Sequence, residues 1–337
     1  MPVSDAVPPL SAGKRSRFGL NGAFLLAAVL LLAAWTCAAF WFQLGPVLRW
    51  VAIAAVVALA ATIVRLGQRR KLFGWLALAV ALVAAVLWWM SIEPSDNRDW
   101  APDVARGITA RIQGSEVIVS NVRNFEWRTE TDFTPRWETR RYEPDAITSV
   151  DLFTSVWGNP AIAHTLISFG FSDGQHLVFS AEIRRERGEE FSEIGGFFKQ
   201  FELVMIAATE SDIVRLRTNM RREDVHLYPL RMSPERAREL FVSFLQMGND
   251  LARQPKFYQT VTSNCTTVIF KLARLVNPGI PLDWRILVSG YLPEYLYDHG
   301  LIANDRPFEE IKAGAAISPR ALKQPDAADF SAMIRRN

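Results

Sequence analysis

The chain has 337 residues, with 38 Lys or Arg, 35 Asp or Glu and a formal net charge of +3. Residues 1–92 hold eight basic residues and one acid, a net charge of +7, whereas the remaining 245 hold 30 basic and 34 acidic residues, a net charge of −4. Because the positive charge is confined to the N-terminal part, the rest lacks the electrostatic basis of nucleic-acid binding, and no nucleic-acid partner is expected.

Three long apolar stretches follow one another at residues 18–44, 46–66 and 72–92. A helix needs about 20 predominantly apolar residues to cross the hydrocarbon core, and each stretch has that length. The first stretch is too long for the apolar core of a cleaved signal peptide, and two more follow it. The sequence therefore predicts an all-α anchor of three transmembrane helices at residues 18–92, with the membrane lipid bilayer as a partner.

The basic residues around these stretches predict their orientation. They lie in the tail at residues 1–17 and in the loop between the second and third stretches, as Lys14, Arg15, Arg17, Arg65, Arg69, Arg70 and Lys71. Loops rich in Lys and Arg stay on the cytoplasmic side. We therefore expect a multi-pass protein of the bacterial inner membrane with a cytoplasmic N-terminus and a periplasmic C-terminal domain.

The remainder of the chain predicts one α+β domain at residues 105–305, preceded by a polar linker at 93–104 and followed by a C-terminal tail at 306–337. Two helices come late: one begins at Ser233-Pro234 and ends before Pro255, and the other spans 264–276. Strands and helices that are segregated along the chain are typical of α+β folds. The predicted strands come first and occupy 108–112, 116–122, 125–131, 136–142, 161–171, 175–183, 201–208 and 225–230.

Cys265 is the one cysteine of the predicted outer domain, since Cys37 lies within the first apolar stretch. The residues before it, Thr262, Ser263 and Asn264, are all good helix N-cap types, which places the thiol in a first helical turn. Unpaired amides and the helix dipole stabilise a thiolate there, as a nucleophilic cysteine requires. The alternative is an inert cysteine packed against the sheet. The spacings typical of metal sites are missing, so neither a metal nor another cofactor is predicted.

A nucleophilic cysteine needs a base, and His164 is the candidate that the pattern favours. It interrupts an otherwise apolar strand, where an imidazole needs a partner. A histidine hydrogen-bonded within the core is the structural alternative. His176, His226 and His299 have polar surroundings and are not expected to take part.

The turn after this strand offers two registers. If Ser172-Asp173 form a type I turn with Gly174 in the left-handed conformation, Phe171 pairs with Gln175 and His164 faces Glu182. A carboxylate across the ladder would orient the imidazole. A two-residue Asp-Gly turn would instead place Ile183 opposite His164 and remove this contact.

Four segments carry a resemblance to a known family: AHTLISFGF, FSAEIRRERGEEF, LRTNMRREDVHLYPL and FYQTVTSNCTT. Over about residues 110–305 the chain resembles the N-terminal periplasmic domain of the Lnb lipoprotein N-acyltransferases, and it is similar to lecithin:retinol acyltransferase and NlpC-type thiol enzymes. The resemblance implies a permuted papain-like fold, in which strands bearing the histidine precede the helix bearing the cysteine.

The same resemblance implies roles for individual residues. Cys265 would be the nucleophile, His164 the general base and Glu182 the residue that orients it or contacts substrate. An oxyanion or substrate contact is implied for the remaining candidates, Tyr258, Asn264, Arg184 and Arg185. The two arginines would meet a lipid phosphate or carboxylate, although a solvated charge run explains them as well.

The leading hypothesis is a membrane-anchored thiol acyltransferase or hydrolase that acts on a lipoprotein or envelope lipid. Because three spans precede the domain, the resemblance implies thiol chemistry near the outer leaflet rather than the full lipoprotein reaction. Two alternatives stay open: a non-catalytic periplasmic binding module on a membrane anchor, and a cysteine peptidase or amidase acting on peptidoglycan. A transporter subunit is disfavoured, because the spans carry no acidic residue that would mark an ion path.

Overall fold

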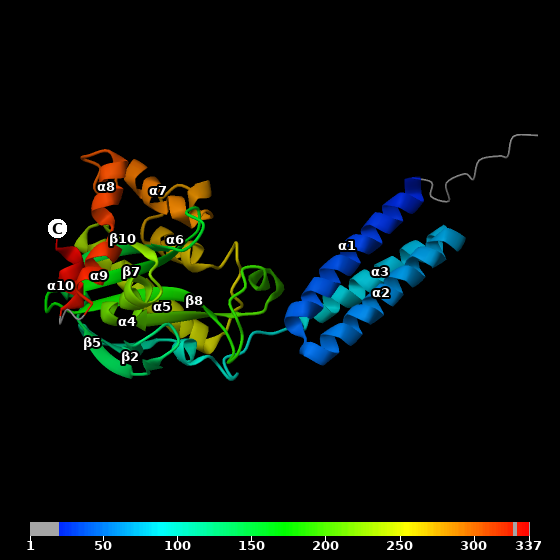
Figure 1. The fold of residues 1–337 in the computed structure, drawn as a ribbon, viewed down its shortest axis with the longest axis horizontal. Coiled ribbons are helices and arrows are strands. Elements are labelled where there is room, and N and C mark those ends of the chain that lie inside the picture. Colours follow the sequence, from blue (N-terminus) through cyan, green and yellow to red (C-terminus); the bar gives the residue numbers. More distant parts are fainter. Residues whose placement is uncertain (1–19, 326–328, 337) are drawn as a thin grey trace, which may run out of the picture. The chain divides into compact units, whose positions relative to one another are not determined.

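The computed structural model describes residues 20–325 and 329–336, and the chain divides into two compact units, residues 1–93 and 94–337 (Figure 1). The predicted cytoplasmic tail, 1–17, and the start of the first predicted span, 18–19, lie outside the described residues. The boundary between the units falls one residue after the end of the predicted anchor.

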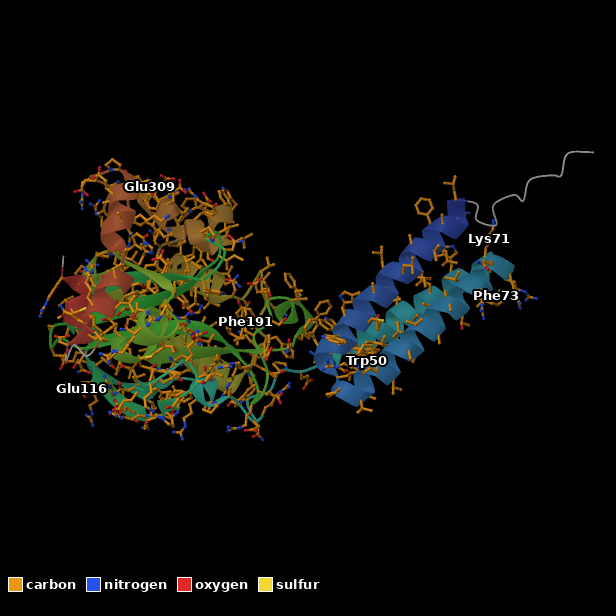
Figure 2. The ribbon with its side chains drawn as sticks, in the orientation of Figure 1. Trp50, Lys71, Phe73, Glu116, Phe191 and Glu309 are labelled. Carbon is orange, nitrogen blue, oxygen red and sulfur yellow. The ribbon has the colours of Figure 1, made fainter. Side chains whose placement is uncertain are left out.

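The first unit consists of three helices that are long and apolar enough to cross a membrane: α1 (Leu20–Gln43), α2 (Pro46–Arg69) and α3 (Lys71–Met90). At 1.5 Å per residue, the shortest of them, 20 residues, spans about 30 Å. Trp50 and Phe73, labelled on the helices in Figure 2, have exposed side chains. Apolar side chains that face outward suit a lipid environment, as predicted for a membrane anchor.

The second unit is built on one large sheet. Its strand order is β1-β2-β9-β8-β7-β6-β10, with β5 paired to the outer side of β2, and all pairs are antiparallel except β2 with β9. The strands are β1 (Thr109–Gln113), β2 (Glu116–Arg123), β5 (Trp137–Tyr142), β6 (Ile147–Val156), β7 (Ala163–Phe171), β8 (His176–Arg184), β9 (Glu202–Ala208) and β10 (Asp224–Pro229); β3 (Glu126–Trp127) and β4 (Phe133–Thr134) form a separate small hairpin.

Helices cover both faces of the sheet (Figure 1). Side chains alternate along each strand, so Ile167 packs with the helices of one face and its neighbour Leu166 with those of the other. The first face carries α5 (Pro234–Arg253), α6 (Cys265–Val276), α7 (Leu292–Asp298) and α8 (Phe308–Ala315). The second face carries α4 (Glu210–Arg215), α9 (Ser318–Lys323) and α10 (Phe330–Arg335).

The fold class is α+β, as predicted, but three features differ from the sequence prediction. Strand β6, in the interior of the sheet, was not predicted. The predicted strand at 125–131 is replaced by the two-residue strands β3 and β4, because the chain turns back between them. Residues 308–325 and 329–336, within the predicted tail, fold as three helices that pack on the sheet.

Candidate active site

Cys265 is the first residue of α6, and the sequence before it explains why the helix begins there. The side-chain oxygen of Asn264 accepts a hydrogen bond from the backbone N–H of Thr267 at 2.8 Å. The Thr267 hydroxyl in turn accepts from the backbone N–H of Asn264 at 2.9 Å. This reciprocal capping box fixes the first turn. The thiol therefore lies at a helix N-terminus, where the positive end of the dipole favours a thiolate.

His164 lies on β7 with only 8% of its surface exposed. Its Nε2 is 2.8 Å from the Ser180 hydroxyl and 3.1 Å from Glu182 Oε1, both on β8. The Ser180 hydroxyl donates to the same Glu182 oxygen at 2.7 Å. These contacts hold the ring by Nε2, which leaves Nδ1 as the nitrogen available to another group.

The hairpin register brings His164 and Glu182 together. Gly174 has a φ of +84°, and Phe171 pairs with Gln175, which is the first of the two registers considered from the sequence. The hydrogen-bonded ladder between β7 and β8 runs from the pair Gly170 and His176 only as far as Ile167 and Phe179. Continuing the same register three residues further places His164 opposite Glu182.

Cys265 meets β7 beyond the end of that ladder. The hydroxyls of Thr165 and Thr266 lie 3.2 Å apart, and Thr165 contributes to the lowered pKa of the Cys265 thiol. At Thr165 the backbone of β7 is no longer paired with β8, so the start of α6 can lie beside this part of the strand. The start of α6 is thus fixed against the strand residue that follows His164.

The charge balance of the pair favours a thiolate beside an imidazolium. Burial alone would raise the pKa of the Cys265 thiol, but the charge of His164 and a hydrogen bond to it lower that pKa to about 6. Burial and the nearby Arg217 would lower the pKa of His164, but Glu182 and Cys265 raise it to about 9. Near neutral pH the two groups therefore form an ion pair, and a thiolate of this kind can attack an electrophilic carbon.

A buried network of charges supports Glu182 from behind. Arg217 contacts Glu182 at 3.3 Å and Glu223 at 3.1 Å, and the Ser155 hydroxyl donates to Glu223. Although burial would raise the pKa of Glu182, His164 and Arg217 hold it well below its usual range. Arg217 lies on a π-helical turn, η4 (Leu216–Met220), that directly continues α4. Such turns are often found at functional sites.

Sequence reasoning missed Ser180 and Arg217. Ser180 lies two residues before Glu182, so it shares the face of β8 that carries the carboxylate, and this period-two spacing was a usable signal. Arg217 carries no comparable signal, because a chain position between two predicted strands does not show which strand residue its side chain will meet.

A cavity of about 450 Å³ opens beside the pair and is lined by His164, Glu182 and Cys265. Tyr258 also lines it, and burial, followed by the charges of Cys265 and Glu182, raises the pKa of its hydroxyl. Tyr258 therefore keeps its proton and can donate a hydrogen bond into the cavity. Arg185 lines the cavity as well, where it pairs with Asp103 at 2.7 Å.

Two predicted contact residues are occupied elsewhere. Arg184 lines a different cavity, with its guanidinium bonded to Asp96 and to the backbone oxygens of Val104 and Ala105. The Asn264 side chain lines the Cys265 cavity, but its oxygen caps α6 and its amide donates to the Thr260 carbonyl at 2.7 Å. Its evident effect is to position Cys265.

The other histidines lie apart from the cavity lining. The His176 ring nitrogen is 3.2 Å from the Gly174 carbonyl, and that of His299 is 2.8 Å from the Tyr295 carbonyl. His226 stacks on Tyr228. Within residues 20–325 and 329–336, no group of three His, Cys, Asp or Glu side chains is placed to hold a metal ion.

Comparison with known proteins gives one match. Residues 133–290 match the family model described as the Lnb N-terminal periplasmic domain. No curated protein matches the chain, and no solved structure matches it. The matched segment includes His164, Glu182 and Cys265 and extends from β4 to the turn before α7.

Proposed function

We propose that the chain is a membrane-anchored thiol enzyme of the bacterial inner membrane, since residues 133–290 match the model of the Lnb N-terminal periplasmic domain. Its N-terminus would be cytoplasmic and its sheet domain periplasmic, with a permuted papain-like order in which the histidine strand precedes the cysteine helix. The observation that carries the proposal is the half-buried Cys265 thiol at the start of α6, with its pKa lowered by His164.

In the proposed reaction the Cys265 thiolate attacks the carbonyl carbon of an ester or amide. The new carbon–sulfur bond forms as the bond to the leaving oxygen or nitrogen breaks, and the proton on His164 Nδ1 passes to the leaving group. In the second step an amine or water attacks the thioester and gives its proton back to His164, and sulfur leaves as the thiolate. Covalent catalysis of this type divides one difficult step into two easier ones.

Neighbouring residues would assist these steps. Ser180 and Glu182 engage Nε2, which would leave Nδ1 for the thiol, and the negative charge of Glu182 would stabilise the imidazolium. The first-turn amides of α6 and the protonated Tyr258 hydroxyl would donate to the oxyanion that develops on the carbonyl oxygen. Arg185, at the same cavity, would meet a phosphate or carboxylate of the substrate.

The proposed substrates are membrane-proximal acyl compounds, namely a lipoprotein or an envelope lipid. The acyl group would pass to an amine in a transferase or to water in a hydrolase. Three apolar helices on the same chain keep the domain at a membrane, so a donor that resides in lipid would be available at high local concentration.

The test is to trap the acyl-enzyme on Cys265. Full-length protein reconstituted in vesicles is incubated with a phospholipid or a diacylated lipopeptide, and its peptides are examined by mass spectrometry. We expect an acyl mass on the Cys265 peptide that neutral hydroxylamine removes. The Cys37 peptide from the same sample is the internal control and should stay unmodified, because Cys37 lies within helix α1 and the sequence has no histidine before His164.

Two variants sharpen the result. Cys265→Ser should abolish the thioester, and His164→Ala should lower its rate of formation with folding retained. If no donor of either class acylates Cys265 in the wild type, while Cys265 remains fully titratable by a small alkylating agent, the acyl-transfer proposal fails.

A further inference from the structure

We propose that the apolar rim of the Cys265 cavity is a lipid-docking surface, through which the domain rests on a bilayer with the cavity mouth toward the lipid. Four large apolar side chains both line the cavity and remain exposed: Trp157 (40%), Ile162 (38%), Phe191 (54%) and Leu287 (56%). Water-soluble domains rarely gather such side chains at one opening, and patches of this kind mark interaction sites.

One side of the rim is the loop between β8 and β9. It exposes Phe191, Ile194 and Phe197, and Figure 2 shows Phe191 on a loop that projects from the sheet domain. The loop is held in place, because the Thr260 hydroxyl donates to the Glu193 carbonyl at 2.8 Å. These apolar side chains are therefore presented by a fixed segment of the domain.

The other side of the rim combines two segments that are distant in sequence. Trp157 and Ile162 lie on the connection between β6 and β7, which is bonded to the Leu287 segment through Gly290 N–H and the Ala161 carbonyl at 3.0 Å. Trp284, 60% exposed, extends this side. Tryptophan side chains of this kind are favoured at the level of lipid headgroups.

The occupant proposed for this surface is a bilayer, because the same chain carries three helices long and apolar enough to cross one. The Ser95 backbone N–H donates to Glu202 at the start of β9, and Arg98 pairs with Glu186 and Glu202, both at 2.8 Å. The chain is thus fixed at the two strand ends between which the Phe191 loop runs. From Met90, the last residue of α3, to Ser95 there are five Cα steps, so in any arrangement of the two units this attachment point lies within about 18 Å of the end of the last apolar helix.

The charges on the loop indicate how the surface would bind. Residues 185–201 carry four acidic and three basic side chains, a net charge of −1, so attraction to anionic headgroups would not drive docking. Burial of the apolar side chains would drive it, as for interfacial segments that insert into the headgroup region. Docking should therefore persist at high salt and in vesicles without anionic lipid. This surface is proposed independently of the chemistry at Cys265.

The experiment places a photo-crosslinking amino acid at Phe191, and separately at Trp284, in full-length protein reconstituted in phosphatidylethanolamine–phosphatidylcholine vesicles. Ile112 is the matched control, since it is 61% exposed on edge strand β1, which contributes nothing to the cavity lining. We expect several-fold more lipid adduct at positions 191 and 284 than at 112, with little change on adding salt. Equal adduct at all three positions, or crosslinks at the rim to a second copy of the chain in place of lipid, would overturn the proposal.

A variant outside the cavity lining gives a second readout. The double change Ile194→Ser and Phe197→Ser should lower the lipid adduct at position 191 several-fold, while the rate of Cys265 alkylation by a small water-soluble reagent stays at its original value. An undiminished adduct in this variant contradicts apolar docking. Because alkylation reports the thiol and the adduct reports the surface, a failure of one proposal is distinguishable from a failure of the other.

Discussion

His164 shows how a single residue can conflict with its local sequence and still be explained by its neighbours. It lies in a strand in which every residue is buried, where an imidazole without partners would be destabilising. Ser180 and Glu182 engage one ring nitrogen, and the other is left for Cys265. An apolar strand broken by one histidine indicates the need for such partners.

At this scale we predict that His164→Ala raises the pKa of the Cys265 thiol from about 6 toward its ordinary value of 9.0, because the charge and hydrogen bond of His164, which lower that pKa most, are lost while burial still raises it. The thiolate fraction at pH 6 should fall from about one half to about 0.1%. Since a thiol of higher pKa is intrinsically the better nucleophile, by about 20-fold over three units, the alkylation rate at pH 6 should drop by roughly 25-fold.

The measurement is the pH dependence of Cys265 alkylation in the wild type and the variant. In the wild type the rate should rise through a midpoint near pH 6, and the ion pair should persist until His164 loses its proton near pH 9. The ion pair therefore exists above about pH 6, where the thiol has lost its proton, and below about pH 9, where the imidazole still carries its own. A wild-type midpoint near 9 would contradict the thiolate assignment.

At the scale of the element, the start of α6 determines where the thiol lies. Asn264 and Thr267 form a reciprocal cap, and α5 begins in a related way, with Ser233 accepting from the Arg236 N–H. Both caps were predicted from the sequence, because Ser and Asn before an apolar helical pattern indicate a helix N-terminus. Only the α6 cap holds a cysteine in its first turn.

We predict that Asn264→Ala lowers the free energy of unfolding by about 1 kcal/mol, the usual value of an N-cap. It should also raise the midpoint of Cys265 alkylation, because a frayed first turn no longer presents its amides to the thiolate. Thermal unfolding and the alkylation profile are the two measurements. Ser233→Ala is the control on another helix: it removes the side-chain N-cap hydrogen bond of α5, at 3.4 Å, and a comparable shift of the alkylation midpoint in that variant would argue against a local role for Asn264.

Strand β6 shows the limit of pattern reasoning at this scale. Residues 147–156 read ITSVDLFTSV, in which five apolar, four hydroxyl and one acidic side chain follow one another without regular alternation. Both faces are covered by helices, so the polar members are satisfied by distant partners such as Glu223, which bonds to Ser155, and Arg335, which bonds to Asp151. A strand whose polar residues are paired across the fold gives no clean period-two signal.

At the scale of the whole molecule, the C-terminal segment is part of the domain. Arg335 on α10 contacts the buried carboxylates of Asp151 and Glu210 at 2.6 and 2.7 Å. Burial would raise the pKa of Glu210, but Arg335 lowers it below its usual value. One arginine near the end of the chain therefore balances two acids on the face of the sheet opposite α5.

We predict that Arg335→Ala lowers the free energy of unfolding by about 3 kcal/mol at pH 8, because it leaves two carboxylates buried without their cation. A carboxyl with a lowered folded-state pKa stabilises above its ordinary pKa and loses that contribution as the pH falls. Without Arg335, burial raises both pKa values, so the deficit should shrink between pH 8 and pH 5, as measured by thermal unfolding.

The control is Arg128→Ala, which removes an exposed ion pair with Asp132 and should leave the thermal unfolding of the domain nearly unchanged, because water and salt screen such a pair. A deficit in Arg335→Ala that is as small as in this control would show that α10 contributes little to the domain. A deficit that does not change with pH would show that burial of the two carboxylates is not its cause.

Local chemistry made much of this protein predictable from its sequence. Three apolar stretches predicted three helices of membrane-spanning length, cap residues predicted the starts of α5 and α6, and the Asp173-Gly174 turn offered the register that pairs His164 with Glu182. Short motifs gave the resemblance to the Lnb N-terminal periplasmic domain, and residues 133–290 match that family model. Each of these signals is carried by residues close together in the chain, where propensity and periodicity act.

The tertiary structure alone decided the rest. It brought Cys265 to β7 across about a hundred residues of chain, placed Arg217 behind Glu182, and assembled the exposed rim from segments that share no sequence pattern. It also decided between the two hairpin registers and folded the C-terminal residues onto the sheet. The physical reason is the same in each case: these contacts join residues far apart in sequence, and a linear pattern records the need for a partner but not which partner packing will supply.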